Sequence, residues 1–192
     1  MESIDRFAAR MQDLWREPLP DAERWERVRV LMPVLLEDPE LRRAAAGWDD
    51  TNGDGYTTTT NLLLYEDPQF GFVINALVKA EGGEVRPHDH AHTWTAYGVI
   101  EGIEKVLRYD LVAGDRESDR AELRLARESV VAPGSVDVIG PYETHAEVAA
   151  SGRTVAVIVR SQRVGIALHA IHDLKTGAVE RRVGPAQVPV RL

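Results

Sequence analysis

Apolar residues near the N-terminus recur at intervals of three and four, the spacing of amphipathic helices. The first such stripe consists of Ile4, Phe7, Ala8, Met11, Leu14 and Trp15. This pattern stops at Pro18, and a second begins at Asp21, which we expect to cap a helix that ends where Pro33 interrupts it. A third helix is expected over residues 39–46. Residues 1–50 are therefore predicted to form a helical layer that packs on the rest of the protein.

From Tyr56 onward, short segments rich in Val, Ile, Thr and Tyr replace the helical pattern. Glycine and proline separate them at Gly82-Gly83, Gly102, Gly114, Pro133-Gly134, Gly140-Pro141, Gly152 and Gly165. Many short strands with regular turns, and no helical pattern between them, predict an antiparallel sandwich or a jelly-roll barrel. Residues 51–192 are therefore predicted to form one mainly β domain.

The length of 192 residues and the hydrophobic content of 44% suit one soluble domain of ordinary size. The longest apolar runs, such as residues 155–159, are far shorter than the roughly 20 residues that span a bilayer. The N-terminus lacks the basic and apolar regions of a secretion signal. The net charge of −8 argues against a nucleic-acid partner. We expect a cytoplasmic protein, monomeric or homodimeric, that binds a small molecule.

The chain contains no cysteine, which excludes disulfides, thiolate nucleophiles, cysteine-ligated zinc and iron–sulfur clusters. Any metal ion must be held by imidazole and carboxylate groups. Such ligands suit Fe(II), Mn, Ni, Cu and Zn without choosing among them.

Three histidines are the strongest chemical signal in the sequence. His88 and His90 are two residues apart in a predicted strand, so both side chains point to the same face. His145 ends a later apolar segment that follows the Pro133-Gly134 turn. We predict that the three imidazoles bind one metal ion inside the barrel.

The frame around these histidines resembles the cupin superfamily. Its first motif runs Gly, five residues, His-x-His, three or four residues, Glu, six residues, Gly, and its second contains a Pro-Gly-type turn and a His. Gly82, His88, His90 and Gly102 are in register with the first motif, whereas Thr95, or Trp94 on the shorter spacing, stands where the usual Glu ligand would be. The resemblance implies a double-stranded β-helix fold. Without the carboxylate, it implies a neutral three-histidine centre with open positions for substrate and O2.

Among such cupins the chain is most similar to the cysteine dioxygenase-like thiol dioxygenases. The segment from Tyr56 to Leu62 resembles their aromatic-led Arg-Asn-Leu strand, and the segment from Ala167 to Ile171 resembles their Ser-x-His-x-Tyr. Three anchoring groups differ, because Thr60 replaces the Arg that binds the substrate carboxylate and Ala167 and Ile171 replace the Ser and Tyr. The resemblance therefore implies a shared metal centre with a different substrate.

Further residues are candidates for the site. We assign His169 and His92 as catalytic candidates that lie near the metal, with packing or orienting roles as the alternative. Thr60, Thr95, Tyr97 and Arg160 are candidates for substrate binding. Arg160 closes an apolar strand, and its guanidinium suits carboxylates, although such a residue more often ends a strand in solvent. Four other residues are assigned lesser roles: Trp94 and Tyr142 as pocket walls, unless they are core, Asp89 as pointing away from the metal, and His172 as a surface residue.

The leading hypothesis is a non-haem Fe(II) dioxygenase that oxidises a small thiol, β-dicarbonyl or phenolic compound with O2. Zn, Ni and Mn suit the same ligands. A non-redox isomerase or hydrolase that uses Zn or Ni is one alternative. The other is a cupin that binds a small molecule without turnover.

Overall fold

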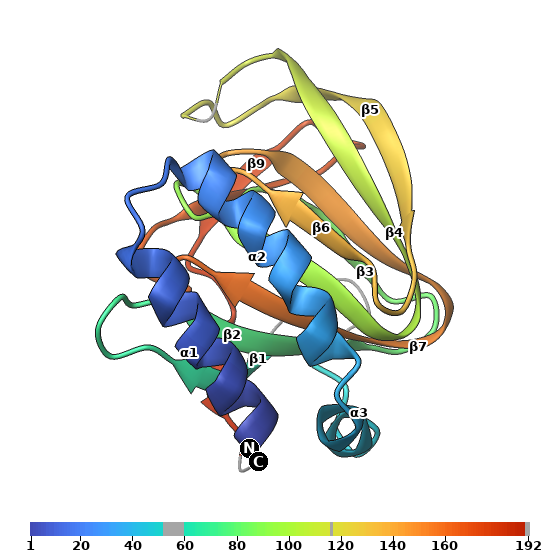
Figure 1. Ribbon diagram of the computed structural model, residues 1–192. Coiled ribbons are helices and arrows are strands. Elements are labelled where there is room, and N and C mark those ends of the chain that lie inside the picture. The colour runs from blue at the N-terminus through green and yellow to red at the C-terminus, as the bar shows by residue number, and fades with distance from the viewer. Residues whose placement is uncertain (52–59, 116, 191–192) are drawn as a thin grey trace.

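The structure is a computed structural model that describes residues 1–51, 60–115 and 117–190. Within these ranges, three helices precede a ten-stranded sheet (Figure 1). The helices are α1 (Glu2–Arg16), α2 (Asp21–Leu36) and α3 (Pro39–Ala45). The strands are β1 (Thr60–Glu66), β2 (Val73–Lys79), β3 (Glu84–His88), β4 (Thr95–Ala113), β5 (Glu122–Val131), β6 (Val136–Ile139), β7 (Thr144–Arg160), β8 (His169–His172), β9 (Val179–Arg182) and β10 (Ala186–Pro189).

The helices follow the predicted apolar pattern, with one correction at Pro33. The apolar face of α1 is buried as its spacing predicts. Helix α2 does not end at Pro33 but continues to Leu36, and its N-cap is Pro20 rather than Asp21. Pro33 lies in the last turn, where its ring forfeits one hydrogen bond, and the burial of Leu35 and Leu36 holds that turn in place. No helix in the described part of the chain is long and apolar enough to cross a membrane.

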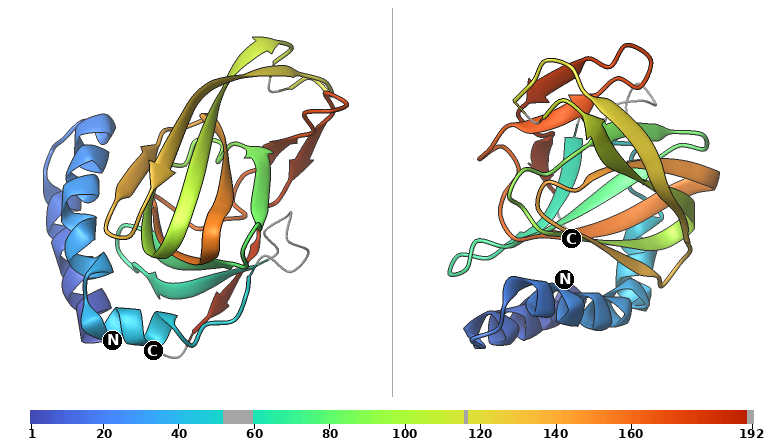
Figure 2. Two further views of the ribbon diagram at one scale, coloured as in Figure 1. Left: turned by 90° about the vertical axis from the view of Figure 1, so that its right-hand side faces the viewer. Right: turned by 90° about the horizontal axis from the view of Figure 1, so that it is seen from above.

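Strand β7 is the centre of the sheet. Its C-terminal half pairs with β2, its N-terminal half pairs with β3, and β4 runs antiparallel along both halves. Register shifts in the β4 and β7 pair fall near Glu101 and Ile103, where the two long strands bend together. The linear strand order is β10-β1-β2-β7-β3-β8-β9. Strand β4 branches from this order at β7 and also pairs with β5 and β6. The bend curls the sheet around an interior, which both views in Figure 2 show.

The helices cover one outer face of the curled sheet (Figure 2, left). One hydrophobic core joins the two layers, and Trp25, Met32 and Leu36 of α2 pack there with Val157 and Val159 of β7. The predicted fold class, a mainly β double-stranded β-helix with N-terminal helices, is thereby confirmed. The division of the chain into domains at residue 50 stays a prediction.

Two glycines that frame the first histidine pair occupy the left-handed region, for different reasons. Gly82 has φ +75°, and a Cβ atom built there would meet nothing within 4 Å. Gly102 has φ +78°, but a Cβ atom there would collide with the backbone carbonyl of Arg153. Gly82 is therefore needed for its backbone angle alone, whereas Gly102 also allows β4 to approach β7 closely.

We expect Gly102→Ala to destabilise the protein more than Gly82→Ala does. A left-handed Ala costs about 1–2 kcal/mol, and forcing two backbones apart adds roughly 1–3 kcal/mol at Gly102 only. Urea denaturation of both variants beside the wild type measures the difference. Equal losses at the two positions would contradict a close approach at Gly102.

Candidate metal centre

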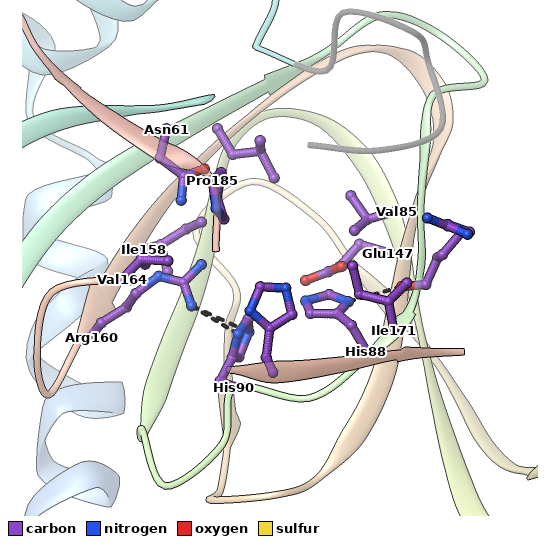
Figure 3. Close-up of a pocket in the computed structure, with 13 residues that line it drawn as sticks. Asn61, Val85, His88, His90, Glu147, Ile158, Arg160, Val164, Ile171 and Pro185 are labelled. Carbon is purple, nitrogen blue, oxygen red and sulfur yellow. Dashed lines mark hydrogen bonds between the residues drawn. The ribbon is translucent and has the colours of Figure 1, made fainter. Parts of the chain in front are cut away.

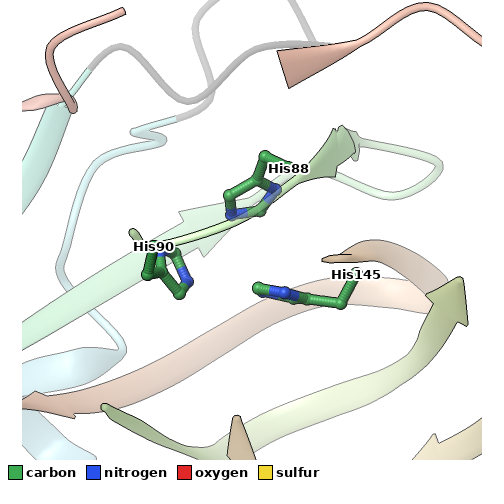
Figure 4. Close-up of side chains that lie close together, drawn as sticks. All are labelled: His88, His90 and His145. Carbon is green, nitrogen blue, oxygen red and sulfur yellow. The ribbon is translucent and has the colours of Figure 1, made fainter. Parts of the chain in front are cut away.

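The three predicted histidines converge at one end of the barrel interior (Figure 4). The register of the β3 and β7 pair sets His88 opposite His145, and His90 follows directly after β3. Their candidate ligand atoms lie within 4.8 Å of one another. Ligand atoms of one ion, at bonds of about 2.1 Å, are separated by roughly 3 to 4 Å. A small closure of the rings would therefore bring all three nitrogens onto one ion.

Backbone carbonyls orient two of these rings. The Nδ1 atom of His88 lies 2.9 Å from the carbonyl oxygen of Arg86, and the Nδ1 atom of His145 lies 3.1 Å from that of Glu143. A neutral ring that donates its Nδ1–H group to a carbonyl turns the lone pair of Nε2 the other way. The Nε2 atom of His145 is buried and has no hydrogen-bond partner among the described residues. These features fit a metal ligand.

His88 and His90 are held neutral, as metal binding requires. Burial lowers the pKa of His88 to about 3, and the neighbouring His145 adds to the effect. Burial also holds the pKa of His90 well below its usual value, and the positive charge of Arg160 lowers it further. Each of these two imidazoles therefore keeps one nitrogen lone pair available near neutral pH.

Arg160 lies inside the protein and not in solvent, although it ends β7. Only 6% of the residue is exposed. Its Nη1 atom lies 3.1 Å from Nδ1 and 3.3 Å from Nε2 of His90, and it donates to Oγ1 of Thr95 at 3.4 Å. Burial lowers the pKa of Arg160 to about 10, which leaves the guanidinium charged at neutral pH. A cation thus stands directly beside the histidine cluster.

A cavity opens between the histidines and Arg160 (Figure 3). Its wall includes Asn61, which is 1% exposed and whose amide oxygen and nitrogen have no hydrogen-bond partner among the described residues. Thr60, the predicted substrate-binding position, does not line this cavity. Successive residues of a strand point to opposite faces, so β1 turns Asn61 inward and Thr60 away. The remaining walls are largely apolar: Leu77, Val85, Ile158, Val164, Ile171 and Pro185.

The two catalytic candidates are placed differently. His169 lines the cavity, is partly buried, and its ring centre is 6.2 Å from that of His88. Burial lowers the pKa of His169. His92 is exposed and lies outside the cluster, because the turn after His90 carries it outward to a contact with Gln162 at 2.6 Å. The structure therefore brings His169 to the site but not His92.

Thr95 and Tyr97, predicted to bind substrate, lie beneath the cavity rather than on its surface. Thr95 is fully buried beside Arg160. Tyr97 donates to Oε2 of Glu104 at 2.6 Å, and Nζ of Lys79 reaches both groups, at 2.9 and 2.8 Å. Burial holds the pKa of Tyr97 well above its usual value. These three residues form a buried hydrogen-bonded network, which sequence reasoning missed because its members are distant in the sequence.

Glu147 is the functional candidate that sequence reasoning missed at the site itself. It follows His145 by two residues in β7, so both side chains face the interior. The residue is 4% exposed, and its Oε1 atom lies 3.3 Å from Nε2 of His145. Burial by itself raises the pKa of Glu147, but His145, His88 and Lys79 outweigh it and hold that pKa well below the usual range. Residues two apart in a strand share a face. This rule, which paired His88 with His90, also identifies Glu147 as a neighbour of His145.

Several minor assignments are corrected or clarified. His172 is buried and not on the surface. Tyr142 is exposed in a loop, and Trp94 stacks on Trp25 of the helical layer, with ring centres 6.3 Å apart, so neither lines the cavity. Asp89 turns to the backbone, where it accepts hydrogen bonds from the N–H groups of Ala91 and Ala170. Tyr56, part of the family resemblance, lies outside the described residues.

No protein-family model matches the sequence, and no curated protein sequence matches it. Solved structures with a similar fold include a recombinant oxalate oxidase in complex with glycolate, with 22% identity and a TM-score of 0.38 over 48% of this chain and 42% of that chain. The cupin domain of Schizosaccharomyces pombe Cnp3 matches with 10% identity and a TM-score of 0.40, over 54% and 64% of the two chains. A double-stranded β-helix protein from Klebsiella pneumoniae matches with 15% identity and a TM-score of 0.43, over 60% and 81%.

The last two of these neighbours are described as a cupin domain and a double-stranded β-helix protein, and the similarity is confined to the fold. The matched region spans less than half of the oxalate oxidase chain. The function therefore has to be argued from the residues of this chain.

We expect the metal-free protein to lose stability as the pH falls from 7 to 5. Unfolded His88 takes up a proton near its ordinary pKa of 6.5, whereas folded His88 resists protonation until about 3. Its stabilising contribution is therefore present above pH 6.5 and lost as the pH falls below it, by about 2 kcal/mol at pH 5.

Urea denaturation across this pH range, with a chelator present, tests the expectation by comparing the wild type with His88→Gln. The free energy of unfolding should fall less steeply in the variant. Parallel pH profiles for the two proteins would show that His88 is not held neutral by the fold.

Proposed function

We propose that the protein is a non-haem Fe(II) dioxygenase that oxidises a small thiol, β-dicarbonyl or phenolic compound with O2. The observation that carries the proposal is the convergence of three imidazoles, two of them buried and one partly buried, beside a cavity that also holds a buried guanidinium. Metal-binding side chains next to a largely apolar pocket with a few polar groups are typical of an enzyme site. The relation to cysteine dioxygenase-like proteins is part of this proposal.

His88, His90 and His145 would hold the ion. Nitrogen ligands of this kind bind Fe(II), and they also bind Mn, Ni and Zn, so iron is proposed from the resemblance in the sequence. When bound, iron lowers the pKa of a coordinated thiol or enol and supplies electrons for reaction with O2.

The other residues of the cavity would bind and orient the substrate. Arg160 suits a carboxylate or another anionic group, because its planar guanidinium makes paired hydrogen bonds. Asn61 offers both a donor and an acceptor, neither of which has a partner among the described residues. His169 is close enough to the cluster to accept or return a proton. Apolar walls such as Leu77 and Ile158 limit the access of water.

Thr60 does not supply the anion-binding group of the resembled family, and Arg160 would supply it from β7 instead. The substrate would then present its anionic group to a different wall of the cavity. A cytoplasmic location, a monomer or homodimer, and the lack of membrane or nucleic-acid partners stay predictions from composition.

Protein purified without oxygen should contain close to one iron ion per chain, and it should consume O2 only when a substrate is added. Metal analysis, followed by oxygen-electrode assays with panels of thiols, β-dicarbonyls and phenols, measures both. Zinc or nickel without O2 uptake would favour a non-redox isomerase or hydrolase. A metal-free protein that still binds small molecules would favour a binding module.

Arg160→Met should raise KM for an anionic substrate about tenfold or more, because a charged hydrogen bond contributes roughly 1.5–3 kcal/mol. The metal content should stay unchanged. Arg163→Met is the matched control, since Arg163 is a nearby arginine paired with Glu66 at the surface. An unaltered KM in the Arg160 variant would show that this residue does not anchor the substrate.

A further inference from the structure

The short distance between His145 and Glu147 is the starting point for a further assignment. Oε1 of Glu147 lies 3.3 Å from Nε2 of His145. Two atoms bound to one ion at right angles, with bonds of about 2.1 Å, are separated by roughly 3.0 Å, and at a tetrahedral angle by roughly 3.4 Å. The observed separation is that of two ligands of the same ion.

Oxygen atoms next to both nitrogens of His145 make this contact unfavourable for a neutral ring without a cation. The Nδ1 atom of His145 faces the carbonyl oxygen of Glu143 at 3.1 Å, and Nε2 faces the Glu147 carboxylate. A neutral imidazole carries one proton, so one of its two nitrogens must direct a lone pair at an oxygen. With the proton on Nδ1, a cation between Nε2 and Oε1 turns this repulsion into two favourable contacts.

The environment of Glu147 also leaves it open to a ligand. The residue is 4% exposed, and its Oε2 atom has no hydrogen-bond partner among the described residues. It lines the same cavity as His88, His90 and Arg160 (Figure 3). A buried carboxylate oxygen without a hydrogen bond is costly, and a metal ion is a partner that compensates for this cost.

Other nearby carboxylates are already engaged. Glu104 accepts from Lys79 and Tyr97, and Glu143 pairs with Arg108 and accepts from the N–H group of Gly140. Because Arg160 adds a positive charge beside the centre, a bound dication needs a negative neighbour. Glu147 is the carboxylate on the cavity wall that meets this need.

We infer that Glu147 is a fourth protein ligand of the metal ion, joining His88, His90 and His145. The inference rests on the metal binding in the proposed function and changes the centre from three neutral ligands to three neutral ligands and one anion. In a six-coordinate ion, two positions then remain for other molecules. A chelating β-dicarbonyl would fill both positions and leave none for O2. A substrate with a single donor atom, such as a thiol, would leave one position for O2 and therefore fits better.

Cobalt(II) binding to Glu147→Gln and Glu147→Asp tests the assignment. Gln removes the charge and keeps the shape, whereas Asp keeps the charge but withdraws the oxygens by one methylene. A ligand role predicts at least a tenfold loss of affinity in both variants, together with a changed d–d absorption spectrum that reports a new coordination sphere. Glu101→Gln is the matched control. Glu101 lies on β4, is half-exposed, and pairs with Arg153 of β7 away from the histidines. Thermal melting of the metal-free proteins verifies that each variant is folded.

The outcomes separate this inference from the proposed function. An unchanged spectrum in the Gln variant would overturn the ligand role and leave the three-histidine centre intact. Loss of affinity in the Gln variant alone, with the Asp variant like the wild type, would assign Glu147 as a counter-charge and also overturn it. If the wild type binds no cobalt, iron or manganese, the proposed metal centre itself fails.

Discussion

The antiparallel register between β3 and β7 is the constraint on which the site depends. It sets His88 directly opposite His145 and so fixes two imidazoles on the inner face of the barrel. Because side chains alternate along a strand, a slip of one residue would turn a whole strand's set of side chains to the outer face. The central position of β7, with partners on both sides, holds this register.

Strand β7 also links the metal centre to the proposed substrate anchor. His145 and Glu147 lie near its beginning, and Arg160 is its last residue. The bend in β7 brings Glu147 and Arg160 to one cavity, and the helical layer packs on the outer side of the same strand through Val157 and Val159. The helices therefore contribute stability to the strand that carries the chemistry, while their own side chains stay outside the cavity.

The buried polar side chains of the interior form two sets, one linked by hydrogen bonds and one lining the cavity. Lys79, Tyr97 and Glu104 are hydrogen-bonded to one another through Oε2 of Glu104 and do not line the cavity, as in a structural network, although Oε1 of Glu104 has no partner among the described residues. Arg160, Glu147 and Asn61 are equally buried but keep polar atoms without hydrogen-bond partners among the described residues, and all three line the cavity. Buried polar groups that line a cavity and lack hydrogen-bond partners are expected where a ligand completes the hydrogen bonds. This expectation is the physical basis for the proposed site.

The sequence by itself determined the elements and the core of the metal centre. Helical periodicity predicted the N-terminal layer, and the two-residue spacing of His88 and His90 predicted their common face, because both signals are local. Pro33 shows the limit of local rules, since packing of Leu35 and Leu36 carried α2 past it. Only the tertiary structure decided that Arg160 is buried, that Asn61 rather than Thr60 faces the cavity, and that His92 lies outside it. Those outcomes depend on strand register and on the bend of β7, which are set by pairings between residues far apart in the chain.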